Sequence, residues 1–276
     1  MNQSSGSLHV TTIGSGPATA VFLHGLLGQG KNLAGAAKAL DGVATSLLID
    51  APNHGLSPWT GEFDYRAMGD AVAAELEQRG AAGKPVVLIG HSMGGKTAMC
   101  LTLDHPELVE KLCVVDIAPV TYSHSKFFTD LISAMRGLDL AALGSRRQAD
   151  QSLAPQIPDP VIRGFVLQNL HHGPSTPAPG DRGPETWHWR ANLALLARAL
   201  PQMEAFPDFA GRHWDGPTLW VSGGRSDYVQ PAYHAAMRAL FPRVELVTVP
   251  GAAHWVHADE PAEFGQLLRN FVTHGE

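Results

Sequence analysis

The sequence is poor in cysteine and contains no long hydrophobic run. Two cysteines, Cys100 and Cys113, among 276 residues are too few for a disulfide framework. Both lie in apolar segments, which is typical of small buried side chains. Because no stretch of about 18 apolar residues exists, we expect no membrane span. The first ten residues also lack a basic and then apolar signal pattern, so the expected location is cytoplasmic.

Charge is also scarce. Asp, Glu, Lys and Arg make up 17% of the chain, whereas about a quarter is usual. The formal net charge is −6, which argues against nucleic acid or an anionic membrane as the main partner. The composition therefore predicts a globular protein without a nucleic-acid partner.

Glycine and proline, in contrast, are plentiful, with 29 and 20 residues. Short apolar runs recur at residues 20–23, 46–49, 86–89, 112–115, 218–221 and 244–249. Most of these runs are continuous rather than alternating, which indicates strands covered on both faces of a parallel sheet. Helical patterns lie between the runs, so the sequence predicts an α/β fold with βαβ crossovers. Ligands of such sheets bind beyond the carboxyl ends of the strands.

This alternation stops between residues 117 and 216. Eleven of the 20 prolines lie between Pro119 and Pro217. Helical patterns at residues 126–136, 146–153, 160–170 and 187–200 are separated there by proline-rich turns, without a strand-like run. We therefore expect a core of residues 1–116 and 217–276, and a helical cap, or lid, of residues 117–216.

One segment, residues 90–97 (Gly-His-Ser-Met-Gly-Gly-Lys-Thr), satisfies two motifs. Gly-x-Ser-x-Gly is a nucleophile elbow, in which small residues flank a serine on a strained turn from strand to helix. Gly-x-x-x-x-Gly-Lys-Thr also matches the phosphate-binding P-loop, in which backbone amides hold phosphates. The pattern alone does not choose between a hydrolase and a nucleotide binder.

The surrounding loops favour the elbow. The first predicted strand ends at His24-Gly25, where small residues can present a backbone amide. The last strand is followed by a glycine-containing loop that carries His254. Asp116 and Asp227 each follow a strand between Ser92 and His254, which gives the order Ser, Asp, His found in α/β hydrolases. The nucleotide hypothesis explains none of these features.

Several segments together resemble the α/β-hydrolase superfamily over nearly the whole chain, and within it the YbfF-type short-chain acyl esterases and their mitochondrial relatives. They are residues 24–26 (His-Gly-Leu), 50–57 (Asp-x-x-Asn-His-Gly-x-Ser), 90–96, 116–122 (Asp-Ile-Ala-Pro-Val-x-Tyr), 189–193 (Trp-Arg-x-Asn-Leu) and 254–258 (His-Trp-Val-His-Ala). The resemblance implies a mostly parallel central sheet flanked by helices, with the cap inserted after strand 6. It also implies hydrolysis of small esters or thioesters with short acyl groups, without a cofactor.

The expected roles follow the scheme of a catalytic triad. Ser92 is the expected nucleophile and His254 the expected base, and the backbone N–H groups of Leu26 and Met93 should form the oxyanion hole. The acid is left as two alternatives, Asp116 and Asp227. The resemblance favours Asp116, because the similar esterases typically lack a carboxylate at position 227. Ser226 is a further hydrogen-bond partner for the acid.

The substrate pocket is expected among apolar and aromatic residues near these groups: His24, Leu26, Leu27, Met93, Tyr122, Phe127, Phe128, Trp187, Trp189 and Trp255. No ligand set for a metal is recognisable. Within the same fold, a cofactor-free perhydrolase or haloperoxidase and a C–C bond hydrolase are alternative functions. A ligand-binding protein built on a hydrolase fold is another.

Overall fold

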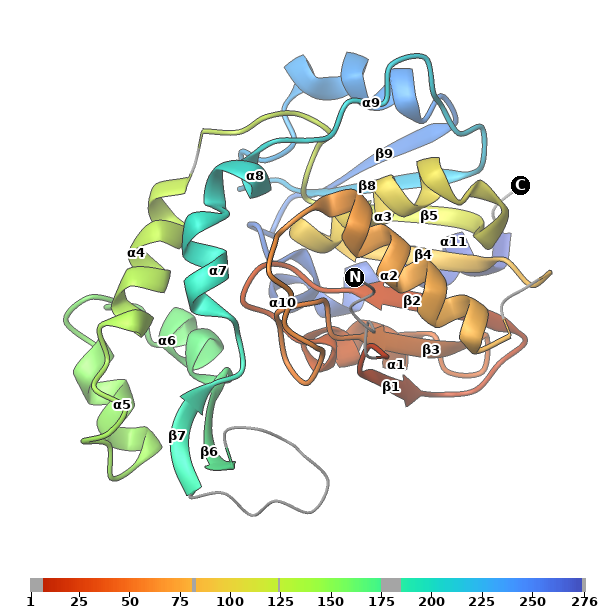
Figure 1. Ribbon diagram of the computed structural model, residues 1–276. Coiled ribbons are helices and arrows are strands. Elements are labelled where there is room, and N and C mark those ends of the chain that lie inside the picture. Colours follow the sequence, from red (N-terminus) through yellow and green to blue (C-terminus); the bar gives the residue numbers. More distant parts are fainter. Residues whose placement is uncertain (1–6, 81–82, 124, 175–184, 275–276) are drawn as a thin grey trace.

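A seven-stranded sheet forms the centre of the molecule, with strand order β1-β3-β2-β4-β5-β8-β9 (Figure 1). The computed structural model describes residues 7–80, 83–123, 125–174 and 185–274. β1 pairs with β3 in the antiparallel direction, and every other pair in this sheet is parallel. The strands are β1 (Val10–Ile13), β2 (Ala18–Leu23), β3 (Ala44–Ile49), β4 (Val86–His91), β5 (Val109–Val115), β8 (Thr218–Gly223) and β9 (Val244–Val249).

Helices cover both faces of the sheet, which explains the continuous apolar runs. In β2, Val21 belongs to one buried cluster with side chains of α2 and α3, whereas Phe22 belongs to a second cluster with α1 and α11. Successive side chains of a strand point to opposite faces, so both must be apolar here. The helices of the core are α1 (Ala34–Ala39), α2 (Tyr65–Gln78), α3 (Met93–Asp104), α9 (His234–Leu240), α10 (Val256–Asp259) and α11 (Pro261–His274), with the 3-10 turns η1 (Gly30–Leu33), η2 (Pro106–Leu108) and η3 (Pro231–Tyr233).

The six predicted strands and the α/β class are confirmed, and Cys100 and Cys113 are both buried. β1 was not predicted, because its sequence Val-Thr-Thr-Ile contains no apolar run and its two threonines are exposed. None of the helices in the described ranges is long and apolar enough to cross a membrane.

The segment between β5 and β8 stands beside the sheet (Figure 1). We call residues 117–216 the cap segment, after the range predicted above. Within its described residues lie α4 (Ser125–Arg136), α5 (Arg146–Leu153), α6 (Pro160–Leu167), α7 (Leu193–Arg198), α8 (Leu200–Glu204) and an antiparallel pair, β6 (Leu170–Pro174) and β7 (Glu185–Trp189).

Two expectations about this segment were wrong. The helix predicted over 187–200 begins only at Leu193, because residues 187–189 belong to β7, where His172 of β6 lies opposite Trp187. The cap segment also follows β5, the fifth strand in chain order, rather than strand 6. In the described residues, a single antiparallel strand, β1, precedes the parallel strands.

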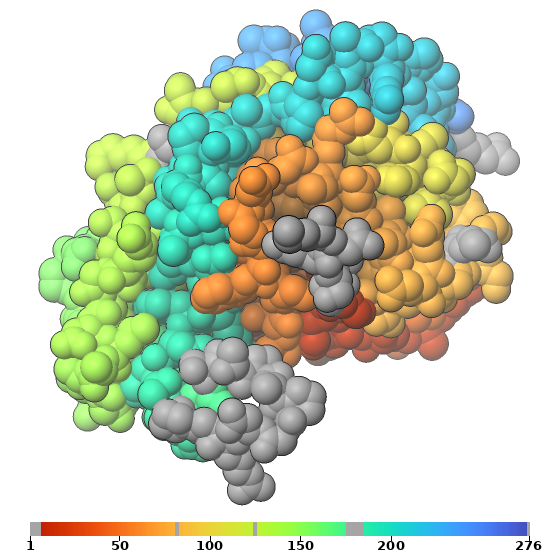
Figure 2. Space-filling view, in the orientation of Figure 1, coloured from red at the N-terminus to blue at the C-terminus, as the bar shows by residue number. Residues whose placement is uncertain are grey.

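Polar contacts join the cap segment to loops at the carboxyl ends of β2 and β3. Asn169 Nδ2 donates to Leu27 O at 2.8 Å, and Gln29 Nε2 donates to Gln168 O at 3.1 Å. Asn192 donates to Asn53 through its backbone N–H, 2.9 Å from the carbonyl oxygen, and through its side-chain amide, 3.0 Å from Oδ1. Figure 2 shows the teal part of the cap segment packed directly against the orange loop that follows β3. The cap segment therefore lies over the edge where ligands of such sheets bind.

Candidate active site

Strand register brings the chemically important loops together. His91 at the end of β4 lies opposite Val115 of β5, which lies opposite Val221 of β8. The next residues, Ser92 and Asp116, donate their backbone N–H groups to the carbonyls of Val115 and Val221, at 3.0 and 2.8 Å. Both side chains therefore start from the same edge of the sheet.

Ser92 occupies a strained turn between β4 and α3. Its backbone has φ 54° and ψ −118°, a conformation that side-chain-bearing residues rarely adopt. The turn depends on Gly94, since a Cβ there would lie 2.2 Å from the carbonyl oxygen of Leu23. These are the features of a nucleophile elbow.

Strain is concentrated at this edge of the sheet. In the described part of the chain, the non-glycine residues with positive φ are Leu27, Asn53, Ser92 and Asp116, with values of 60°, 68°, 54° and 51°. Each lies in the loop that follows one of the strands β2, β3, β4 and β5. Such strain costs about 1–3 kcal/mol per residue and gathers at active sites, where the surrounding structure maintains it.

Ser92, His254 and Asp116 form a continuous hydrogen-bond chain. His254 Nε2 lies 3.0 Å from Ser92 Oγ, and His254 Nδ1 lies 2.7 Å from Asp116 Oδ2. Asp227, the alternative acid, is exposed, and the Nδ1 hydrogen bond goes to Asp116 instead. The expectation that Asp227 could orient His254 is therefore not met by this geometry.

The Asp116 carboxylate is fully buried and well supplied with donors. Its side chain has 0% exposure. Oδ1 accepts the backbone N–H of Gly223 at 3.0 Å, and Oδ2 accepts the hydroxyl of Ser226 as well as Nδ1 of His254. These donors satisfy the hydrogen-bonding capacity of the buried carboxylate, and each of them also fixes its orientation.

Neighbouring rings hold His254 in place. The ring of Tyr228 stacks on His254 with centroids 4.1 Å apart. Tyr122 donates its hydroxyl to the carbonyl of Tyr228 at 2.6 Å, which anchors the loop carrying that ring. On the other side, His91 Nε2 lies 2.8 Å from the carbonyl oxygen of His254. His254 is thus held at the face of its ring by Tyr228 and at its backbone carbonyl by His91.

The loop after β2 lies against the elbow. A Cβ on Gly25 would be 2.9 Å from His91 Nδ1 and 3.3 Å from Ser92 Cβ, so the loop backbone touches the nucleophile turn. Among the hydrogen bonds of the described residues, none uses the backbone N–H of Leu26 or of Met93 as donor. Two unused amides beside a serine hydroxyl are what an oxyanion hole requires.

Buried histidines support that loop. His54 Nε2 accepts the N–H of Leu27 at 3.2 Å, and His24 Nε2 accepts the N–H of Ala51 at 2.9 Å. The two rings meet edge to face, with centroids 5.2 Å apart. His24 and His54 thus connect the loops after β2 and β3, and they fix the strained backbone beside Leu26.

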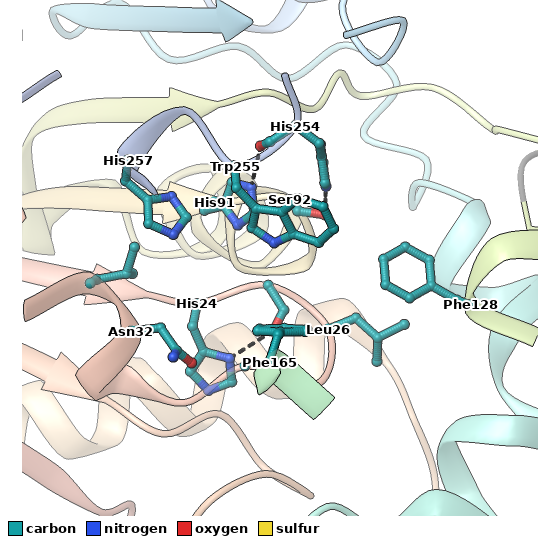
Figure 3. Close-up of a pocket in the computed structure, with 13 residues that line it drawn as sticks. His24, Leu26, Asn32, His91, Ser92, Phe128, Phe165, His254, Trp255 and His257 are labelled. Carbon is teal, nitrogen blue, oxygen red and sulfur yellow. Dashed lines mark hydrogen bonds between the residues drawn. The ribbon is translucent and has the colours of Figure 1, made fainter. Parts of the chain in front are cut away.

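Ser92 lies between two hollows of different character. We call the first the His254 pocket (Figure 3); it encloses about 330 Å³ including its mouth. It is lined by His24, Gly25, Leu26, Gly28, Asn32, Leu33, His91, Ser92, Phe128, Phe165, His254, Trp255 and His257. The second, the Met93 pocket, encloses about 480 Å³ including its mouth. It is lined by Leu26, Tyr65, Ser92, Met93, Ile117, Tyr122, Phe128, Leu200, Met203, Glu204 and Tyr228.

Six of the ten expected pocket residues line these hollows: His24, Leu26, Met93, Tyr122, Phe128 and Trp255. Four do not. Leu27 is buried behind the loop, and Phe127 is 42% exposed. Trp187 packs on His172 in the small sheet, and Trp189 donates its indole N–H to Met135 O. These tryptophans were misplaced because the segment was taken for a helix, whereas it is a strand distant from Ser92.

Sequence reasoning missed several lining residues, above all Asn32, Tyr65, Phe165, Glu204 and Tyr228. Phe165 lies on a predicted cap helix and could have been included with the other cap aromatics. Glu204 and Tyr65 had no distinguishing signal, since they reach the site only through tertiary packing.

Lys96, the P-loop lysine of the alternative motif, is buried within the molecule. Its Nζ donates to the carbonyls of Val120, Met203, Glu204 and Ala205, at 3.1, 3.3, 2.7 and 2.8 Å. Burial lowers the pKa of Lys96 to about 7, while the charges of Cys100 and Glu204 act in the opposite direction. The side chain therefore joins α3 to both ends of the cap segment, and it is not positioned for a phosphate.

Three histidines around Ser92, His24, His54 and His91, are buried, and a fourth, His257, is partly buried. Burial, together with the neighbouring His254, lowers the pKa of His257 to about 4. Burial and the adjacent His24 lower the pKa of His54 to about 3. Burial also lowers the pKa of His24, and that of His91 well below its ordinary value.

In the described residues, no three His, Cys, Asp or Glu side chains are grouped so as to hold a metal ion.

These pKa values predict that the protein loses stability in mild acid. Above pH 6.5 the rings are neutral in both states. Between pH 6.5 and 4 the unfolded chain binds protons that the folded rings of His54 and His257 do not, so the free energy of unfolding falls by about 1.4 kcal/mol per pH unit for each ring. Urea unfolding at pH 7.5 and 5.0 measures the difference. In His257→Phe the free energy of unfolding should fall less between these two pH values. A wild-type protein that is equally stable at both pH values would contradict the prediction.

Comparison with known proteins agrees with the geometry. The family model of the alpha/beta hydrolase fold matches residues 20–261. The sn-1-specific diacylglycerol lipase ABHD11 of Mus musculus is 40% identical over 259 residues, which are 92% of this chain and 80% of the mouse protein. Esterase YbfF of Escherichia coli (strain K12) is 29% identical over 253 residues, 92% of each chain.

Among solved structures, a marine microorganism esterase superposes with a TM-score of 0.88 at 30% identity, covering 96% of this chain and 99% of the esterase. The resemblance predicted from the sequence motifs is thereby confirmed. The chain belongs to the alpha/beta hydrolase fold family, and it is a hydrolase of the esterase and lipase type.

Proposed function

We propose that the protein is a serine-dependent carboxylic ester hydrolase whose triad is Ser92, His254 and Asp116. The observation that carries the proposal is the hydrogen-bond chain at 3.0 and 2.7 Å on a strained elbow, open to two pockets. The names of the similar proteins, an esterase and a lipase, support ester bonds as the target.

In the first half of the reaction, His254 Nε2 removes the proton from Ser92 Oγ as this oxygen attacks the ester carbonyl carbon. The negative charge that develops on the carbonyl oxygen is stabilised by the N–H groups of Leu26 and Met93. Asp116 holds Nδ1 of His254 and stabilises the imidazolium. The C–O bond to the alcohol then breaks, and His254 returns the proton to the leaving oxygen.

In the second half, His254 removes a proton from water, whose oxygen attacks the acyl-Ser92 carbonyl. The same two amides stabilise the second oxyanion, and the carboxylic acid leaves as Ser92 regains its proton. Every step uses side chains and amides of this chain, so the proposed reaction needs no cofactor. A thioester reacts in the same way, with a thiol as leaving group.

The cap segment supplies one wall of each pocket, Phe165 to the His254 pocket and Leu200, Met203 and Glu204 to the Met93 pocket. We infer that this segment is the lid that limits substrate size. Because both hollows are small and side chains of the cap segment form part of their walls, we expect small esters with short acyl groups to fit them best.

A chain-length series tests this proposal. kcat/KM should be highest for p-nitrophenyl acetate or butyrate and should fall towards the decanoate; acyl-thioesters of the same lengths show whether the thiol leaving group is accepted. Ser92→Ala, measured in parallel, gives the background. Rates that rise steadily to decanoate would contradict the short-chain preference, and rates no higher than those of Ser92→Ala would contradict the function.

A further inference from the structure

The two pockets can be assigned to the two halves of an ester, given the proposed function. The leaving oxygen must receive its proton from His254 Nε2. His254 lines the His254 pocket but not the Met93 pocket. The alcohol side of the ester therefore belongs in the His254 pocket, and the acyl chain extends from Ser92 into the Met93 pocket.

The Met93 pocket is mostly apolar. Most of its wall consists of Leu, Ile, Met and aromatic side chains. The hydroxyl of Tyr65 donates to Met203 O at 2.9 Å, and that of Tyr122 donates to Tyr228 O. Glu204 is the carboxylate among the lining residues, and its Oε1 is buried without a hydrogen-bond partner in the described part of the chain.

The position of Glu204 is fixed by its backbone. Its carbonyl oxygen accepts Lys96 Nζ at 2.7 Å, at the end of α8. The residue is partly buried at the pocket wall, where the buried Oε1 that lacks a donor is unfavourable. A bound molecule that brings a donor to Oε1 would remove this deficit.

We propose that Glu204 selects acyl groups that carry a hydroxyl on the chain, so that the preferred substrates are esters of short hydroxy acids. The apolar wall accommodates the methylene groups, and Oε1 accepts the hydroxyl proton. A neutral donor suits this mostly apolar pocket better than an ammonium group, whose charge would be costly to bury among apolar side chains. A site that offers a buried hydrogen-bonding group discriminates strongly against an analogue that lacks the partner.

The test uses methyl esters of ω-hydroxy acids with three to six carbons. Each is compared with the alkyl ester in which a methyl group replaces the hydroxyl, for example methyl 4-hydroxybutyrate with methyl pentanoate. The wild-type enzyme should show a higher kcat/KM for the hydroxy ester at one or more lengths. Glu204→Met should reduce that preference by about 10- to 100-fold, chiefly by raising the rate on the alkyl ester and lowering it on the hydroxy ester.

Two variants complete the design. Glu204→Gln keeps an acceptor oxygen and should retain part of the preference. Glu185→Met, at an exposed glutamate of β7, should leave the preference unchanged. A wild-type enzyme without preference at any length, or a Glu204→Met variant that changes both esters equally, would overturn the inference while the proposed function stands. If the wild-type enzyme hydrolysed neither ester in every pair, both the inference and the proposed function would be overturned.

Discussion

Asp116→Asn should lower kcat for ester hydrolysis by about 10⁴-fold, whereas Asp227→Asn should leave it within about threefold of the wild type. An asparagine at position 116 can offer its amide N–H to His254 Nδ1, which stabilises the wrong tautomer and leaves Nε2 protonated. Asp227 is exposed and outside the hydrogen-bond chain, so its charge is largely screened by solvent. Steady-state kinetics with p-nitrophenyl butyrate measures both variants.

The control for this pair is thermal unfolding, because Asp116 also accepts hydrogen bonds from Gly223 and Ser226. Activity is compared at a temperature where each variant is fully folded. Equal and mild losses in the two variants would refute Asp116 as the acid. A large loss in Asp227→Asn alone would transfer that role to Asp227.

Lys96→Met should destabilise the protein by about 2–5 kcal/mol, because it leaves buried carbonyl oxygens without their donor. Lys96 is 1% exposed, and its ammonium group lies 4.9 Å from the centre of the Tyr122 ring. Methionine keeps the length of the stem but removes the charge and every hydrogen bond. Since the acceptors lie at the two ends of the cap segment, amide hydrogen exchange should accelerate around Val120 and around residues 203–205.

Lys126→Met is the matched control. Lys126 lies on α4 with 87% side-chain exposure and pairs with Asp130, an arrangement that contributes little to stability. Its loss should change the free energy of unfolding by less than about 0.5 kcal/mol. If Lys96→Met behaved like this control in both urea unfolding and hydrogen exchange, Lys96 would not join the cap segment to the core.

The parts of the site that follow from local pattern could be predicted. Ser92 stands in a turn that requires glycines at fixed positions before and after the serine, so the motif is visible in the sequence. His24 and His254 stand in loops at strand ends. The continuous apolar runs marked strands buried on both faces, because only such strands lack a polar side. For the same reason β1, with two exposed threonines, gave no signal.

The parts that depend on distant packing could not be predicted. Asp116 and Asp227 both follow strands, and only the turn after β5, with φ 51° at Asp116, directs one of them to His254. The alternation in Thr186-Trp187-His188-Trp189 fits a strand as well as a helix end, and pairing with β6 decides it. Glu204 reaches the pocket through the path of α8, which no local pattern records.

Labelling with a fluorophosphonate probe, followed by peptide mass mapping, measures whether Ser92 is an activated nucleophile. We expect one covalent adduct on Ser92, no adduct in Ser92→Ala, and slower labelling in Asp116→Asn than in Asp227→Asn. An adduct on another residue, or labelling that persists unchanged in Ser92→Ala, would contradict this expectation.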